Sequence, residues 1–387
     1  MATYHRPVSA PRPEPTGVDA LRAAFAHREP FTVGLEEELM LLHPETLDLE
    51  PRALDVLARA PEDVRFKQEM PAAQLEIALP PAQTVGALAA GLHAARRDLA
   101  DAAGGIGLLA GAGIHPFTRA EGALNDGERY ARIAREFASV ARRQLVYGLH
   151  VHVAVPDPDV ALAVYNAVRE HLPALAALGA GSPFYEGHDS GLASVRPMLC
   201  DLLPRQGVPP AFGSWDALAD ALAWGRTTGA FADASQWWWE ARLHPRYGTV
   251  EIRVPDTQAT VADTIALAAV VHALVADLSA RAQAGEELGA APSWRIAENR
   301  WSACRHGVEG RWHDVWSGRS EPMAEHLHHL LDRLGPAARD LRCEAELRAA
   351  RDLIDHPRAA AARAAAQQDG GDAARSVTAW LARRFLG

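Results

Sequence analysis

The segment Gly34-Leu35-Glu36-Glu37-Glu38-Leu39 decides the fold, because it has the pattern of a β-strand with acids on one face. Side chains alternate between the two faces of a strand, so Glu36 and Glu38 share one face and Leu35 and Leu39 share the other. The two acids are about 6.7 Å apart along the strand, and their charges repel by about 2.5 kcal/mol at an effective dielectric constant of about 20. Such a pair requires either protonation or a bound cation.

Three further segments repeat this pattern of ligand-type side chains at alternate strand positions. They are 74–79 with Glu76, 149–153 with His150 and His152, and 250–254 with Glu251 and Arg253. If these strands form one sheet with 34–39, one face is an apolar core and the other collects carboxylates, histidines and an arginine. Because most of these ligands are oxygen atoms, the pattern favours Mg²⁺, or alternatively Mn²⁺, over zinc.

The composition is that of an ordinary soluble chain. Its 387 residues suffice for a large core, with 48% hydrophobic and 23% charged residues. The net charge of −10, without a basic stripe, argues against nucleic acid as a partner. Three widely separated cysteines and an N-terminal segment without an apolar signal core fit a cytoplasmic protein. The longest apolar stretch, 265–275, contains His272 and predicts a buried helix rather than a membrane span.

The order of elements predicts an α+β fold with a mainly antiparallel sheet and a C-terminal helical part. We expect strands at 31–42, in a pair at 64–79 closed by Pro80-Pro81, near 104–115, at 147–155, and in a hairpin at 236–254. We expect helices from Thr84 to 103, over 128–144, from Asp157 or Asp159 to 178, from Ser214 to 224, from Thr260 to 283 and around 299–305. We assign 1–17 to a disordered tail, 18–319 to one catalytic domain and 320–387 to helices packed on it.

Several motifs have a structural interpretation beside the functional one. Taken alone, the pair His150 and His152 fits metal ligation and hydrogen-bonded polar surface equally well, and the neighbouring acids favour ligation. Trp237 to Trp239 favour core packing over an adenine platform. Lys67 is the chain's only lysine, which coding bias explains more simply than function does. The chain contains no P-loop sequence, so metal ions would have to hold a polyphosphate substrate.

Seven stretches together resemble the type 2 glutamate–cysteine ligases, a family of carboxylate–amine ligases in the glutamine-synthetase-like superfamily. They are GLEEEL (34–39), KQEMPAAQLEIAL (67–79), GLHVHV (148–153), SPF (182–184), DSGLASVR (189–196), VEIRVPD (250–256) and NRWSACRHG (299–307). The resemblance implies an antiparallel sheet that forms an open funnel with helices packed behind it, and ATP with Mg²⁺ as cofactors. One departure is Val195-Arg196, where the family usually has Tyr-Arg.

The resemblance also implies roles for individual residues. One metal ion would be held by Glu38, Glu69 and Glu76, and a second, which bridges the nucleotide phosphates, by Glu36, His150 and Glu251. Arg253 would point at the γ-phosphate and act in catalysis together with Glu251, and Lys67 would lie beside the nucleotide. The residues assigned to substrate binding are His152, Arg196, Arg300 and Arg305.

The implied chemistry is ATP-dependent amide formation. The γ-carboxylate of glutamate attacks the γ-phosphorus of ATP, and a small amine such as cysteine then attacks the acyl phosphate, releasing ADP and phosphate. A cover must exclude water from the acyl phosphate, and the segment 181–213 is our candidate. Two alternatives stay open: a metal-dependent hydrolase that uses His150 and His152, and a non-catalytic nucleotide-binding homologue. We expect small-molecule substrates, no membrane partner, and a homodimer as one possible assembly.

Overall fold

The fold is built on a seven-stranded sheet whose neighbouring strands all run antiparallel. The computed structural model describes residues 15–26, 29–155, 157–367 and 371–387, so nearly all of the predicted tail at 1–17 lies outside the described residues. The strand order is β2-β3-β1-β5-β9-β8, and β4 pairs with the end of β1. The strands are β1 (Val33–Leu42), β2 (Phe66–Gln68), β3 (Gln74–Ala82), β4 (Leu108–Ala110), β5 (Leu149–Ala154), β8 (Ala241–His244) and β9 (Thr249–Ile252). This architecture confirms the predicted α+β class with a mainly antiparallel sheet.

The principal helices begin at the capping residues that the sequence predicts. Thr84, Asp157 and Thr260 each accept a backbone N–H hydrogen bond in the first turn of α3, α6 and α9. The helices are α1 (Val18–Ala24), α2 (Ala53–Leu57), α3 (Val85–Ala103), α4 (Glu128–Phe137), α5 (Ser139–Arg142), α6 (Pro158–Gly179), α7 (Arg196–Cys200), α8 (Trp215–Thr228), α9 (Val261–Gln283), α10 (Ser293–His306), α11 (Met323–Arg333), α12 (Gly335–Asp340), α13 (Glu344–Asp355), α14 (Arg358–Ala366) and α15 (Ala373–Arg384). Two small hairpins, β6 (Phe184–Tyr185) with β7 (His188–Asp189) and β10 (Arg311–His313) with β11 (Ser320–Pro322), lie outside the main sheet.

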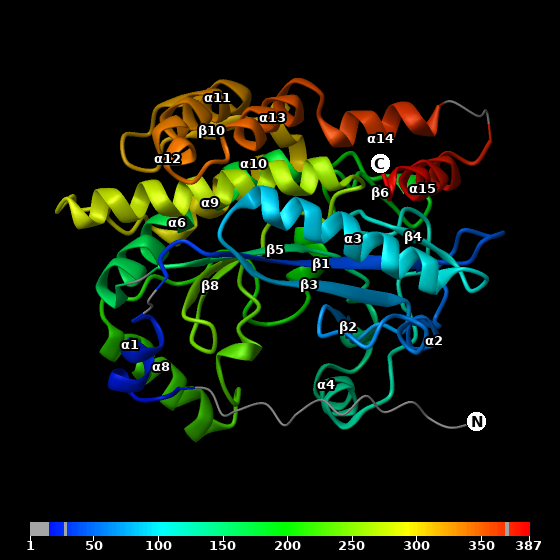
Figure 1. The fold of residues 1–387 in the computed structure, drawn as a ribbon, viewed down its shortest axis with the longest axis horizontal. Helices are drawn as coiled ribbons and strands as arrows, with labels where there is room; N and C mark the ends of the chain where they lie inside the picture. The colour runs from blue at the N-terminus through cyan, green and yellow to red at the C-terminus, as the bar shows by residue number, and fades with distance from the viewer. Residues whose placement is uncertain (1–14, 27–28, 156, 368–370) are drawn as a thin grey trace.

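Helices cover one face of the sheet, where α3, α6 and α9 pack on the strands (Figure 1). Leu35, Leu39 and Val151 point to this side and belong to one apolar cluster with the helices. By length and composition α9 could cross a membrane, yet 83% of its apolar window is buried inside the protein. It is therefore the core helix predicted around 265–275. The opposite face of the sheet, towards α4, lacks this helical layer (Figure 1).

The C-terminal helices extend the core. α12 and α13 pack on α9, and α11 packs on α6, as a second helical layer (Figure 1). Leu327, Leu331 and Leu353 belong to the same apolar cluster as the sheet. Because β11 pairs with β10, hydrogen bonds also cross the domain boundary drawn at residue 320. The division into two parts therefore stays a prediction, while the apolar core is continuous across it.

Several element bounds differ from the expected ones. The first strand of the expected hairpin begins at Ala241 instead of 236, and α8 runs to Thr228 instead of 224. Two further differences have a clear structural cause. β3 continues through Pro80 and Pro81 to Ala82, because β1 still pairs with it there beyond an irregularity in the register. The helix expected over 128–144 breaks at Ala138, whose φ of 48° lies in the left-handed region. The segment therefore forms two helices, α4 and α5, on the side of the sheet that the helical layer leaves open.

The tryptophan triplet divides between the core and a cavity. Trp237 is buried and packs between Phe212 and Phe231, with ring centroids 5.8 and 5.7 Å away. Trp238 instead lines the large cavity on the polar face of the sheet. The core-packing interpretation is thus confirmed for Trp237.

The middle acid of the segment 34–39 lies on the face covered by helices. Glu37 is fully buried and accepts two hydrogen bonds from Arg96 of α3, at 2.9 and 2.5 Å. Arg96 is equally buried and also donates to the carbonyl oxygens of Gln258, Ala259 and Phe385. One ion pair therefore joins β1, α3, the segment before α9 and the C-terminal end of the chain.

We predict that Arg96→Ala lowers the free energy of unfolding by about 3–5 kcal/mol, because it leaves the Glu37 carboxylate buried without its counter-charge. Urea unfolding followed by circular dichroism measures the change. Arg97→Ala is the matched control, since Arg97 is the next residue of α3 and is exposed; its effect should stay within about 0.5 kcal/mol. A loss below about 1 kcal/mol for Arg96→Ala would show that the pair does not anchor the fold.

Candidate functional site

The antiparallel register places the polar side chains of six strands side by side on the face opposite the helices. The cross-strand pairs are Lys67 with Glu76, Glu76 with Glu38, Glu36 with His150, His152 with Glu251, and Glu251 with Arg242. We refer to these eight residues as the polar row. The row unites side chains that strand alternation assigns to one face, although they are far apart in the sequence.

A cavity of ≈ 930 Å³ opens over the polar row. The sheet contributes Glu36, Glu38, Glu76, His150 and Arg242 to its lining, and Lys67, Glu69, Arg196 and Arg253 join them. The other walls come from α4, with Tyr130, and from a region that includes Trp238 and Tyr247. A cavity of this volume lies in the range of cofactor and substrate sites.

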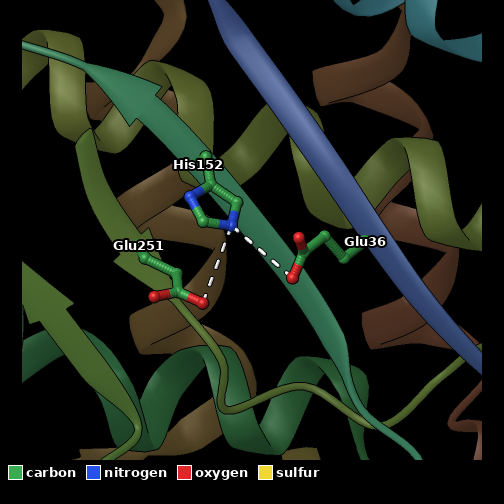
Figure 2. A group of neighbouring side chains, drawn as sticks. All are labelled: Glu36, His152 and Glu251. Atoms are coloured by element: carbon green, nitrogen blue, oxygen red, sulfur yellow. Dashed lines mark ion pairs between the residues drawn. The ribbon is translucent and has the colours of Figure 1, made fainter. Parts of the chain in front are cut away.

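Three ligand-type atoms converge beside this cavity. Glu36, His152 and Glu251 each offer one atom within 4.8 Å of the other two (Figure 2). The Nε2 atom of His152 is 3.8 Å from Glu36 Oε2 and 3.6 Å from Glu251 Oε1. This nitrogen is buried and has no hydrogen-bond partner among the described residues, while Nδ1 lies 3.0 Å from the hydroxyl of Thr249. Two carboxylates around an unpartnered ring nitrogen fit a divalent cation.

His150 occupies the neighbouring position, one cross-strand pair away. Its Nδ1 atom is 3.3 Å from Glu36 Oε2 and 3.4 Å from Arg253 Nη1. Burial and the charge of Arg253 lower the pKa of His150 to about 4, so the ring is neutral near pH 7. Both histidines therefore contact Glu36, and the assignment of His150 to the metal and His152 to substrate stays a prediction.

Glu38, Glu69 and Glu76 form a second group of acids, at the other end of the polar row from Glu251. Burial makes the charged form of these three carboxylates unfavourable. Burial raises the pKa of Glu38 to about 7, although its carboxylate accepts a 2.5 Å hydrogen bond from Gly148 N–H. Burial and the charges of Glu36 and Glu69 raise the pKa of Glu76 well above its ordinary value. Burial and the charge of Glu38 likewise raise the pKa of Glu69. A divalent cation would supply the missing positive charge at Glu38, Glu69 and Glu76.

Glu251 is the opposite case, a buried acid that stays ionised. Burial disfavours its charge, but Arg242 and Arg253 hold the pKa of Glu251 well below its ordinary value. Arg253 Nη1 donates to Glu251 Oε1 at 2.5 Å, and Arg242 donates to the same carboxylate from the other side. Because Arg253 also lines the cavity, Glu251 orients a guanidinium group towards any ligand there.

Lys67 bridges the two groups of acids. Its Nζ atom lies 3.1 Å from Glu36 Oε1 and 2.9 Å from Glu76 Oε1. Burial opposes the ammonium charge, but Glu76 and Glu36 outweigh it and raise the pKa of Lys67. The only lysine of the chain therefore supplies positive charge where carboxylates crowd, and its contact with nucleotide stays a prediction.

The other arginines assigned to substrate are occupied by the protein itself. Arg196 lines the cavity but donates to the carbonyl oxygens of Arg253, Val254 and Pro255. Arg300 binds Asp201 and Glu240, and Arg305 donates to Gly191 O. Arg300 and Arg305 are not among the described residues that line this cavity. All three fasten loops around the site, and direct substrate contact stays a prediction.

Arg242 is a site residue that the sequence interpretation missed. It lies on β8 opposite Glu251, in the fifth cross-strand pair of the polar row. The signal was present, because Glu240, Arg242 and His244 alternate at the strand period just as the other ligand-type residues do.

Comparisons with known proteins identify a family for the chain. The family model of glutamate–cysteine ligase family 2 matches residues 32–379. A protein of Rubrobacter xylanophilus named "Putative glutamate--cysteine ligase 2-3" is 39% identical over 84% of this chain and 90% of its own length. A protein of Micrococcus luteus named "Putative glutamate--cysteine ligase 2" is 35% identical over 86% of each chain.

Solved structures show the same fold at low sequence identity. The glutamate–cysteine ligase of Francisella tularensis, solved in complex with AMP, superposes with a TM-score of 0.69 at 12% identity and covers 93% of this chain and 90% of that one. The bifunctional glutathione synthetase of Pasteurella multocida gives 0.64 at 14% identity, covering 95% of this chain and 53% of that one. The open antiparallel sheet with its helical backing is therefore the fold of these ligases.

We predict that Mg²⁺ raises the melting temperature more at pH 8 than at pH 6. The pKa of Glu38, about 7 in the fold, lies above its ordinary value of 4.5. The native state therefore binds more protons than the unfolded state, and the metal-free protein loses stability as the pH rises between these two values. A cation that binds the ionised carboxylates offsets this loss at high pH and competes with protons at low pH.

Differential scanning fluorimetry at the two pH values measures this effect. Glu38→Gln is the informative variant, since it removes the titrating carboxylate with little change of shape, and its Mg²⁺ shift should depend less on pH. Equal Mg²⁺ shifts of the wild-type protein at pH 6 and pH 8 would contradict cation binding at these acids.

We predict that Mg²⁺ accelerates acylation of Lys67 by an N-hydroxysuccinimide ester. A cation among Glu36 and Glu76 releases the ammonium group and removes the negative charges that raise its pKa. Mass spectrometry reads the modification unambiguously, because the chain has no other lysine. The terminal α-amino group is the internal control and should react equally with and without Mg²⁺. Labelling of Lys67 that Mg²⁺ leaves unchanged would place the cation elsewhere.

Proposed function

The chain belongs to glutamate–cysteine ligase family 2, and from this membership we propose that it joins the side-chain carboxylate of glutamate, or of a similar amino acid, to a small amine. Its enzyme class is that of an ATP-dependent ligase that forms a carbon–nitrogen bond. Its substrates are small molecules, and we assign the reaction to the cytoplasm. Cysteine is the first candidate for the amine because the related proteins carry that name.

The polar row is the observation that carries this proposal. Buried carboxylates with raised pKa values face an open cavity, and the chain has no P-loop whose backbone N–H groups and lysine would hold the phosphates. Hard oxygen ligands of this kind suit Mg²⁺, and Mg²⁺ in such sites accompanies polyphosphate substrates. The unpartnered Nε2 atom of His152 between Glu36 and Glu251 supports a cation at that end of the row.

We assign two cation positions, of which only the one at Glu36 and Glu251 has donor atoms that already converge among the described residues. Glu38, Glu69 and Glu76 would hold one ion, and Glu36 and Glu251 with a histidine would hold the other. When bound, Mg²⁺ would neutralise the charge of the polyphosphate and of the phosphoryl group in transfer.

The chain's own residues supply the remaining functions. Arg253, held by Glu251 at the cavity wall, is placed to stabilise the negative charge of the phosphoryl group as it moves. Arg242 also lines the cavity and shares the charge of Glu251 with Arg253, so that the site keeps a net positive charge at this end. The bond between the γ- and β-phosphates breaks as the glutamate oxygen bonds to phosphorus. The amine then forms the amide and expels phosphate, with its proton passed to a base.

We expect ADP and phosphate release to depend on both a carboxylate and an amine, with the amide detected by mass spectrometry. A screen of carboxylate and amine pairs with Mg²⁺ and ATP identifies the substrates. Glutamate labelled with ¹⁸O in its side-chain carboxylate should transfer one label to the released phosphate, because that oxygen bonds to phosphorus. Arg253→Ala is the negative control and should lose about 10²–10³-fold in kcat while it still binds ATP.

Three results would each change the assignment. Amide formation without label in phosphate points to an adenylate intermediate. Turnover with zinc in the absence of ATP points to a hydrolase that uses His150 and His152. Nucleotide binding without turnover for any amine points to a non-catalytic homologue.

A further inference from the structure

Helix α4 forms one wall of the cavity but is weakly attached to the rest of the protein. It lies across from the helical layers, below β2 in Figure 1, and its main packing partner is the short helix α5. In α4, which the structure describes completely, Tyr130 is the one buried side chain. Its hydroxyl donates to Gln68 O at 2.9 Å, which ties the start of α4 to β2. A wall held by a single buried side chain opens at low energetic cost.

The backbone at both ends of α4 has the geometry of a hinge. Gly127 precedes the helix with φ 143° and ψ 150°, a region that glycine alone visits readily. Ala138 follows it with φ 48° and ψ −129°, an unfavourable conformation for a residue with a Cβ atom. Such strained positions persist where the surrounding structure requires them, and they cluster at moving parts of functional sites. The two ends of α4 are therefore able to change direction while the helix stays intact.

The free end of α4 reaches the far side of the cavity mouth. Phe137, the last residue of the helix, packs edge-on against Trp238 with ring centroids 5.7 Å apart. Trp238 lies before β8 and also contacts the guanidinium group of Arg205. α4 thus spans the mouth between a fixed end at Tyr130 and an aromatic contact at Phe137.

Two exposed arginines flank the apolar side of α4 where this side meets the cavity. Arg129, Arg132 and Ile133 line the cavity, whereas Ala131 and Arg135 lie outside its lining. Arg129 and Arg132 make no ion pair or side-chain hydrogen bond with any residue that the structure describes. Arg129 lies over the ring of Tyr130, and its charge acts on Glu69 in the cavity. Two guanidinium groups at the mouth of a cavity, neither in an ion pair within the described part of the chain, are able to bind anionic oxygen atoms.

The segment 181–213, which the sequence predicts as the cover, is attached to the protein much more firmly than α4 is. Within 181–213, Ser182, Ser194 and Arg196 are buried, and Ser194 donates to Asp256 at 3.0 Å. Arg196 donates to three carbonyl oxygens after β9. This part of the segment belongs to the fixed wall.

We propose that α4 is the hinged cover of the ligase site, and that Arg129 and Arg132 bind an anionic group of a substrate as it closes. The inference rests on the proposed function, which supplies anionic oxygen atoms from two sources, the phosphates of ATP and the α-carboxylate of the amino acid. Closure excludes water from the acyl phosphate while the arginines hold the substrate. The helix therefore couples substrate binding to protection of the intermediate.

The first experiment measures binding of MgATP and of glutamate by isothermal titration calorimetry. Arg129→Ala and Arg132→Ala should each weaken one of the two ligands about tenfold or more, as expected for loss of a charge-assisted hydrogen bond. The ligand that loses affinity identifies the anion. Arg135→Ala is the matched control on the same helix and should bind both ligands within about twofold of wild type.

The second experiment measures hydrogen exchange of the backbone amides of 128–137. The bound ligand should slow exchange in the wild-type protein and should slow it much less in the double variant Arg129→Ala, Arg132→Ala. Ala138→Gly relieves the strained φ, so it should keep the melting temperature but loosen the cover. That variant should release more phosphate for each amide formed.

Wild-type affinity of the double variant for both ligands would overturn the inference, as would exchange in α4 that ligands do not change. These outcomes are distinct from failure of the proposed function. A wild-type protein that binds MgATP but forms no amide contradicts only the reaction, and the titrations still test the arginines. A wild-type protein that binds neither ligand contradicts both.

Discussion

The buried ion pair between Glu37 and Arg96 sets the register on which the site depends. Glu36, Glu37 and Glu38 follow one another on β1, so one face receives two acids and the other receives one. A slip of one residue would send Glu36 and Glu38 into the apolar core and Glu37 into the cavity. Arg96 lies on the core side and contacts Glu37 through two hydrogen bonds. The ion pair thus acts as a register device rather than as a source of net stability.

The acids of the polar row are costly for the folded state, and either protonation or a bound cation relieves that cost. Glu38, Glu69 and Glu76 are buried acids whose raised pKa values show that the fold disfavours their charged form. Lys67 compensates part of this repulsion, because its ammonium group contacts both Glu36 and Glu76. The charges of Arg242 and Arg253 outweigh the burial of Glu251, which explains why the pKa of that acid is lowered rather than raised. The site therefore has one end balanced by arginines and one end that lacks positive charge.

The sequence predicted the elements well because their signals are local. Thr84, Asp157 and Thr260 cap helices in the first turn, and alternation along 34–39, 74–79 and 149–153 assigns each side chain to a face. The identity of the histidine between Glu36 and Glu251 was not predictable, because it depends on how β5 pairs with β9. The sequence could not predict the partner of Glu37 either. Arg96 lies on a helix far along the chain, and only tertiary packing brings it to the strand. The break at Ala138 has no composition signal, because alanine ordinarily continues a helix.

The two sides of the cavity have opposite mechanical requirements. Metal ligands must hold their geometry to within a fraction of an ångström, and the proposed ligands Glu36, Glu76 and Glu251 lie on strands backed by the apolar core. A cover must open for each substrate, so it has to be drawn from the least stable part of the structure. α4 meets that requirement, since a single buried tyrosine and one aromatic contact hold it. The antiparallel sheet makes this division possible, because helices on one face supply the stability and leave the other face open to bear the ligand and its cover.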